Sequence, residues 1–162
     1  AQPVETATPA EPGAPVPAAQ PPVAEQPRAE KKPEEDLSAD EKKVLDQLNA
    51  ERKRWGRRPL KVNRHLMKAA RRHAANMARW NTMSHYLGGN VSQRVAATGV
   101  WMRSSGENIA QGQHSPQAVM TTWMASSGHR NNILSTGYTD VGIAMARSNN
   151  GTPYWVQVFA LP

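Results

Sequence analysis

The sequence contains no cysteine among its 162 residues, which excludes both a disulfide framework and thiolate metal sites. It also lacks any apolar run approaching the roughly 20 residues that a membrane-spanning helix requires. Acidic residues are scarce in one part only, because residues 52–162 hold 15 Lys and Arg but two acids, whereas residues 1–51 hold 11 acids and five bases. The acidic first part and the basic second part are therefore expected to differ in their electrostatic behaviour.

Aromatic residues are missing from residues 1–36, which hold nine of the 13 prolines together with many Ala and Glu. Repeated proline removes backbone donors and favours extended chain, and so few apolar residues cannot form a core. We therefore predict a disordered linker over 1–36 and a folded domain over 37–162. The chain begins at Ala1 without a charged n-region or an apolar h-region. This start is compatible with a mature exported chain, so export is a hypothesis.

Capping residues and periodic apolar positions predict four helices in the folded part. Ser38 and Glu41 have the spacing of a capping box, and Pro116 has the first-turn position that suits proline. The expected helices are a first that begins at Ser38 and ends before Gly56, a second capped by Asn63, a short one near 92–97, and one from Ser115 that stops at Gly128.

The C-terminal part changes its hydrophobic period. Apolar residues alternate with others over 139–145 and again over 154–159, with Asn150-Gly151 between them. Alternation predicts strands, and Asn-Gly is a strong hairpin signal, although the loop looks longer than two residues. Helices followed by an antiparallel hairpin indicate the α+β class.

Glu107 and Asp140 are the only carboxylates in residues 52–162, so each is a candidate functional group. The simplest alternative for Glu107 is a salt-bridge partner among many bases. His73 lies on the apolar stripe of the second expected helix and is interpreted as a satisfied core histidine. His85 and His129 instead lie next to glycine or in expected irregular chain, where functional side chains are common.

Two imidazoles and one carboxylate can ligate zinc and leave a fourth position for water. However, no His-Glu-x-x-His motif or other local metal spacing supports such a set. Ser126, His129 and Glu107 could be drawn as a Ser-His-acid hydrolase, but the sequence has no Gly-x-Ser-x-Gly elbow.

Several motifs follow one another along the folded part, namely Gly-Glu-Asn-Ile-Ala at 106–110, Ser-Gly-His-Arg at 127–130, Asn-Ile-Leu at 132–134 and Trp-Val-Gln-Val-Phe at 155–159. In this order they resemble the CAP superfamily of cysteine-rich secretory, antigen 5 and pathogenesis-related proteins, and its bacterial, cysteine-free SCP-like members in particular. The resemblance covers about residues 38–160. It implies a three-layer α-β-α sandwich with a central antiparallel sheet and a cleft lined by two His and two Glu.

The resemblance also implies which residues of this chain line that cleft. His85 is similar to the first His, Glu107 to the Glu of the Gly-Glu-Asn motif, and His129 to the second His. Ser126 stands where the family's other Glu is expected, which removes one anionic ligand. Asn132 belongs to the same set, with bracing of a loop as its alternative role. His85, Glu107 and His129 are the expected ligands of Zn²⁺ or another divalent cation.

The resulting functional hypothesis is an exported, extracellular or periplasmic CAP domain that is non-enzymatic and binds a small molecule or an envelope ligand in this cleft. We expect it to be a monomer without a transmembrane segment. The alternative is a metal-dependent hydrolase of peptide or wall polymer, in which Glu107 serves as general base or as ligand.

The segment from Arg52 to Arg72 contains ten bases and no acid. Such a surface attracts polyanions through counterion release, without reading a sequence. It predicts an anionic polymer as a partner and an adhesion role, with a solvated face as the alternative. No nucleic-acid-binding motif is present, so sequence-specific nucleic-acid binding is not expected.

Overall fold

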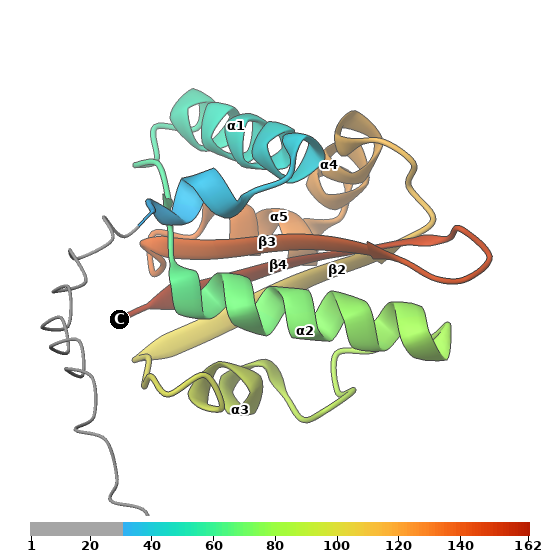
Figure 1. The fold of residues 1–162 in the computed structure, drawn as a ribbon. Coiled ribbons are helices and arrows are strands. Elements are labelled where there is room, and N and C mark those ends of the chain that lie inside the picture. Colours follow the sequence, from blue (N-terminus) through green and yellow to red (C-terminus); the bar gives the residue numbers. More distant parts are fainter. Residues whose placement is uncertain (1–30) are drawn as a thin grey trace, which may run out of the picture. The chain divides into compact units, whose positions relative to one another are not determined.

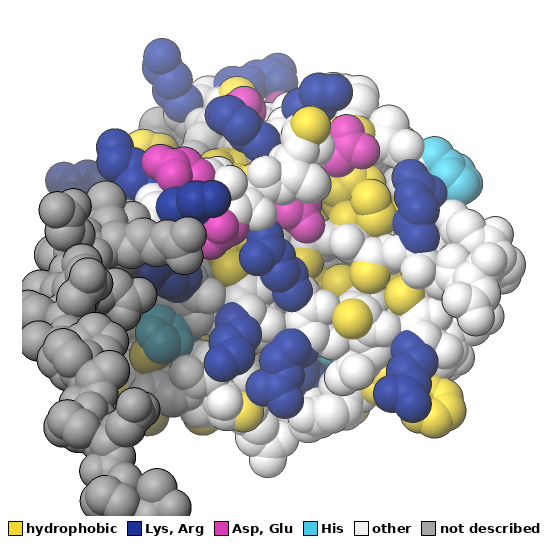
Figure 2. All heavy atoms as spheres, in the orientation of Figure 1, with side chains coloured by type: hydrophobic (Ala, Val, Ile, Leu, Met, Phe, Trp, Pro, Cys, Tyr) yellow, Lys and Arg dark blue, Asp and Glu magenta, His cyan; other side chains and the backbone are white. Residues whose placement is uncertain are grey.

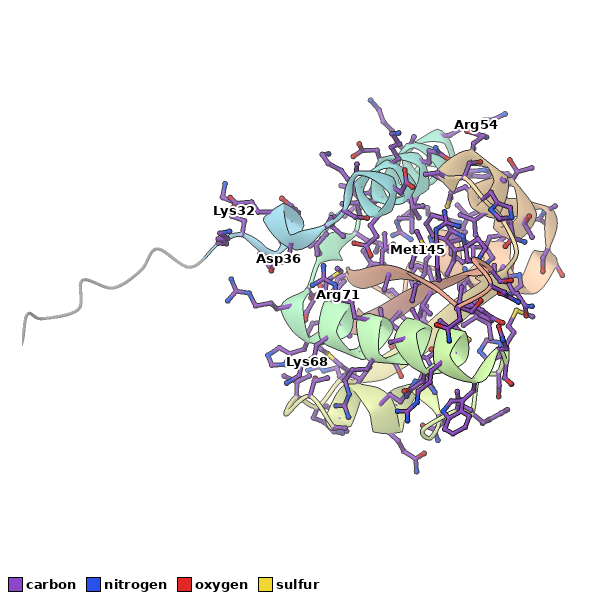
Figure 3. The ribbon with its side chains drawn as sticks, turned by 45° about the vertical axis from the view of Figure 1, so that its right-hand side comes forward. Lys32, Asp36, Arg54, Lys68, Arg71 and Met145 are labelled. Atoms are coloured by element: carbon purple, nitrogen blue, oxygen red, sulfur yellow. The ribbon has the colours of Figure 1, made fainter. Side chains whose placement is uncertain are left out.

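The computed structural model describes residues 31–162, and these residues form a single unit of packed elements. The predicted linker therefore lies outside the described residues except for its last six. Within those six, Pro33–Asp36 forms a 3-10 helix, η1, rather than extended chain. Arg71 donates a hydrogen bond to the carbonyl of Asp36, and Figure 3 shows these two residues side by side. The contact fixes η1 against the second helix of the domain.

Helices cover both faces of a central sheet, as the three-layer prediction requires (Figure 1). Helices α2 and α3 lie on one face, and α1, α4 and α5 lie on the other. The elements are α1 (Ala39–Arg54), β1 (Lys61–Val62), α2 (Arg64–Trp80), α3 (Val91–Ala96), β2 (Ser104–Gln111), α4 (Pro116–Ala125), α5 (Ser127–Leu134), β3 (Asp140–Arg147) and β4 (Pro153–Leu161).

The sheet has the strand order β1-β3-β4-β2, so β2 forms one edge. Strands β3 and β4 form the predicted hairpin, and β4 pairs antiparallel with β2 as well. The predicted antiparallel sheet is confirmed, and β1 adds a two-residue parallel pair to β3 at the other edge. A pair of residues is too short to show a hydrophobic period, so this strand had no signal in the sequence.

Strand β4 is buried on both faces and supplies side chains to two separate cores. Trp155 and Phe159 pack with α1, α4 and α5, whereas Val156 and Val158 pack with α2 and α3. Side chains of a strand alternate between the two faces, so a strand at the centre of a sandwich must be apolar in both registers. This is why 154–160 is almost continuously hydrophobic.

The predicted helix starts are confirmed, but one predicted helix end is wrong. Ser38 and Glu41 form the capping box of α1, and the side chains of Asn63 and Ser115 cap α2 and α4. The chain does not leave the helical conformation at Gly128, because α4 ends at Ala125 and residues from Ser127 form α5. A glycine can lie inside a helix when its neighbours pack, which a stop signal read from sequence does not reveal.

Helix α2 approaches β3 so closely that a side chain larger than hydrogen has no space at Gly142. A Cβ atom built there would lie 2.2 Å from the carbonyl carbon of Leu66 and 2.5 Å from the amide nitrogen of Met67. The obstacle is helix backbone, which cannot swing aside as a flexible side chain can. Gly142 therefore sets the distance between α2 and the sheet.

We expect Gly142→Ala to lower the free energy of unfolding by about 2–3 kcal/mol, the upper range for overpacking. The measurement is urea unfolding followed by far-UV circular dichroism. Gly128→Ala is the matched control, because its Cβ would meet nothing within 4 Å and alanine favours helix. An equal loss in both variants would contradict the close approach of α2.

Candidate functional site

Glu107 lies on β2 with its side chain only 3% exposed, and basic side chains surround its carboxylate. Its Oε1 is 2.9 Å from Nδ1 of His85 and 3.6 Å from Nε2 of His73. Its Oε2 forms an ion pair with Nη2 of Arg94. The alternative interpretation of Glu107 as a salt-bridge partner is therefore correct, and both carboxylate oxygens already have cationic or imidazole partners.

Arg94 is the residue of this group that the sequence did not single out. It lies on α3 and is buried. Its Nη1 donates to the carbonyl of His85 at 2.7 Å and also to the carbonyl of Gly89. The same side chain thus neutralises Glu107 and fixes the 85–89 loop. A buried charge needs such a partner, because an unpaired carboxylate out of water is strongly unfavourable.

His85 lies in the irregular segment between α2 and α3, as predicted, and its side chain is 48% exposed. The Glu107 carboxylate accepts a hydrogen bond from Nδ1 when the ring carries its proton there. In the neutral ring this arrangement leaves Nε2 as a hydrogen-bond acceptor. The buried carboxylate therefore holds one imidazole at the surface in a defined tautomer and orientation.

His73 is fully buried, as predicted for a core residue, but it is not a satisfied histidine. Neither ring nitrogen makes a hydrogen bond of ordinary geometry. Burial is the largest effect and lowers its pKa; Glu107 and the backbone of Ser84 raise the pKa, and Arg94 and His85 lower it. His73 is therefore neutral at pH 7 and belongs to the Glu107 group. Its place on an apolar helix stripe could not indicate the carboxylate that it faces.

His129 lies on helix α5 and not in the irregular chain that was expected. Its Nδ1 is buried without a partner, and its carbonyl accepts a hydrogen bond from Nδ2 of Asn108 at 3.1 Å. Burial lowers the pKa of His129, and the positive charge of His85 lowers it further. Among residues 31–162, no hydrogen bond joins His129 to the His85–Glu107 pair.

The edge position of β2 explains how side chains from the two helix layers come near each other. Glu107 faces His73 of α2 and Arg94 of α3, whereas the next residue, Asn108, faces α5. Successive side chains of a strand point to opposite faces. His85 therefore contacts Glu107 from the α2–α3 side of β2, whereas His129 lies on the α5 side.

The other two predicted site residues lie on or beside helix α5: Asn132 belongs to the helix, and Ser126 precedes it. Nδ2 of Asn132 donates to the carbonyl of Glu107 at 3.2 Å and to Oδ1 of Asn108 at 3.0 Å. Asn132 therefore braces α5 against β2, as its alternative role predicted. Ser126 lies between α4 and α5 and makes no side-chain cap bond to α5.

The predicted metal ligands do not fit a metal site in this arrangement. Within residues 31–162, no group of three or more His, Cys, Asp or Glu side chains is placed to hold a metal ion. Both oxygens of Glu107 are engaged, and the guanidinium of Arg94 lies where a ligated cation would be repelled. The arrangement is suited to holding His85 as a hydrogen-bonding group.

The lowered pKa values of His73 and His129 predict the pH dependence of stability. Below pH 6.5 the unfolded chain binds protons at these histidines that the folded chain does not, so the free energy of unfolding falls as the pH drops through this range. His73→Gln should reduce this slope in urea unfolding between pH 8 and pH 5. The exposed His114 offers a control, because His114→Gln should keep the slope of the wild type. A slope unchanged by His73→Gln would contradict the assignment.

Comparison with known proteins places the whole sandwich in one family model. The model of the cysteine-rich secretory protein family, CAP, matches residues 45–159. The uncharacterized protein YkwD of Bacillus subtilis is 37% identical over 125 residues, which are 76% of this chain and 48% of that protein. The uncharacterized membrane protein YlbC of the same organism is 29% identical over 75% of this chain and 34% of its own length. The chain thus spans about half or less of the curated relatives it matches.

Solved structures show the same fold. An outer surface protein of Borrelia burgdorferi superposes with a TM-score of 0.73 at 21% identity, over 78% of this chain and 95% of that one. An extracellular protein of Bacillus anthracis that contains an SCP domain gives a TM-score of 0.67 at 26% identity, over 76% of this chain and 40% of that one. The fold of this chain is therefore shared with both of these proteins.

Proposed function

Because this chain belongs to the cysteine-rich secretory protein (CAP) family, we propose that it is an exported domain that binds a small molecule or a cell-envelope ligand at the His85–Glu107 site. Its role in this proposal is binding, without turnover. The observation that carries the proposal is the 2.9 Å contact between the buried carboxylate and an exposed imidazole. This contact fixes a polar group at the surface before any ligand arrives, which reduces the entropy lost on binding.

Two exposed aromatic rings lie in segments that adjoin the elements of the site and supply apolar contact area. Tyr86, the neighbour of His85, is 78% exposed, and so is Trp101 in the segment that leads into β2. A cavity of about 280 Å³ is lined by Trp101, Ser105 and residues of α3. Ser105 lies two residues before Glu107 and so points to the same face of β2. Flat aromatic surface beside hydrogen-bonding groups favours a ligand with a ring and polar substituents, such as an envelope glycan.

Export rests on the nature of the structural neighbours, which are described as an outer surface protein and an extracellular protein. Among residues 31–162, no helix has the length and apolar character needed to cross a membrane. A cysteine-free domain stabilised by two packed cores needs no disulfides outside the cell.

The surroundings of Glu107 do not favour a metal-dependent hydrolase. That mechanism requires Glu107 as a ligand or as the base for a metal-bound water, and its oxygens are held by Arg94 and His85. The proposed ligand site consequently uses no divalent cation.

The proposal predicts binding of soluble muropeptides, released from peptidoglycan by a muramidase, to the full chain. Amide signals of residues 84–87 and 104–107 should shift in ¹⁵N–¹H spectra, because these segments surround the imidazole. His85→Ala should weaken the affinity at least tenfold, about 1.4 kcal/mol, since it removes the oriented hydrogen-bonding group. His114→Ala, which alters an exposed histidine elsewhere, should bind as the wild type does.

The muropeptide titration, followed by the same ¹⁵N–¹H spectra, is then repeated in the presence of EDTA. The affinity should be unchanged if the site needs no metal. Affinity lost in EDTA, or binding that His85→Ala leaves intact, would contradict the proposed site. A spectrum without shifts would exclude wall glycan as the ligand.

A further inference from the structure

A further cavity lies away from the histidine site. It has a volume of about 660 Å³ and lies where the end of α1, the 55–60 loop, β1 and the segment before β3 meet. Strand β1 is the edge of the sheet opposite to β2, so the two sites are separate. The volume falls in the range of 300–1,000 Å³ that is typical of small-molecule sites.

Four bases and one acid line this cavity, namely Arg52, Arg57, Arg58, Lys61 and Asp140. Asp140 accepts hydrogen bonds from two neutral donors, Asn63 at 2.8 Å and Thr139 at 2.9 Å, so the excess of bases in the lining comes from their number. In Figure 2, Lys and Arg side chains are spread across the visible face of the domain. The few Asp and Glu side chains on that face lie toward α1. The cavity differs from the rest of that face because a buried arginine side chain forms its floor.

Arg52 forms that floor and is only 2% exposed. Its Nε donates to the carbonyl of Arg58 at 2.7 Å, and its Nη1 donates to the carbonyls of Ile133 and Ser135 at 2.7 and 2.9 Å. One buried side chain thereby ties the 55–60 loop to the end of α5. Gly56, with a φ of +68°, allows the chain to reverse there.

The three remaining cations have no such internal role. Arg57, Arg58 and Lys61 are exposed, and their side chains form no ion pair or hydrogen bond within the described part of the chain. Burial lowers the pKa of Arg52, and the positive charge of Arg57 lowers it further. Like charges held around one hollow repel each other, and a bound anion relieves that repulsion.

We propose that this cavity, the Arg57–Lys61 pocket, binds the phosphate of an organic phosphate ester. Three unpaired cations match a dianion better than a monoanion, and guanidinium groups bind phosphate oxygens in pairs. The ring of Tyr138, which stacks on Phe159 with centroids 5.7 Å apart, and Pro59 form an apolar wall for the organic part. The phosphate can come from a soluble ester or from a repeating unit of a polyol-phosphate polymer.

The test is isothermal titration of the full chain with sn-glycerol 1-phosphate and, separately, with a poly(glycerol phosphate) chain. We expect saturable binding of sn-glycerol 1-phosphate, the monomeric ester, and an affinity that falls as the salt concentration rises. Arg57→Gln and Lys61→Gln should each weaken it at least fivefold, and the double variant at least twentyfold. Tighter binding of the polymer would identify the repeating unit as the source, and equal affinity per phosphate would identify a soluble ester.

Arg147→Gln is the matched control, because it removes the same charge at the opposite end of β3, where Arg147 donates to the carbonyl of Gly151 in the hairpin. It should change the affinity less than twofold. An equal loss in Arg147→Gln and Arg57→Gln would overturn the pocket in favour of diffuse charge attraction. Binding of the polymer without the monomer, or no binding of either, would overturn it as well. His85→Ala should not affect this site, so its outcome is independent of the histidine site.

Discussion

The buried ion pair between Glu107 and Arg94 is the interaction on which the candidate site depends. Glu107 is held inside the protein by β2, where its charge would be strongly unfavourable without a cation. Arg94 supplies the cation and in the same position bonds the carbonyls of His85 and Gly89. The pair therefore determines where the 85–89 loop lies and which nitrogen of His85 is free. A cation supplied by the chain also explains why the group does not form a metal site.

The position of β2 at the sheet edge turns this pair into a surface site. A central strand such as β4 is covered on both faces and on both sides, and its polar residue Gln157 is fully buried against Asn108. At the edge, side chains from the α2–α3 layer and from α5 can reach around the same strand. Asn132 and Asn108 fix α5, and with it the backbone of His129, to the other side of β2.

Local signals made much of the fold predictable. Ser38, Asn63 and Ser115 cap helices through bonds within three residues, so their sequence spacing is sufficient. Strand β2 was not predictable in this way, because Ser104–Gln111 is mostly polar and becomes a strand through its pairing with β4. The split between α4 and α5 was also missed, since Gly128 looks like a stop signal whatever its surroundings.

The site was predictable only in part, because its contacts join residues that are far apart in the sequence. The family resemblance indicated His85, Glu107 and His129, and the first two do meet. Nothing in the sequence distinguished Arg94 from the other bases of the domain, because its importance arises from a contact with a residue 13 positions away on another element. His73 was correctly placed in the core, yet its neighbour there is the carboxylate of Glu107 rather than apolar side chains alone.

The most direct test of this account is a double-mutant cycle in urea unfolding at pH 7.5 with Arg94→Met, Glu107→Gln and the double variant. Breaking a buried ion pair from the arginine side should cost about 3–5 kcal/mol, because it leaves Glu107 charged and unpaired. The double variant should lose at least about 1 kcal/mol less than the sum of the single losses, since the remaining charge is then removed as well. Losses that simply add would show that Arg94 and Glu107 act independently, and the site would not be organised by their pairing.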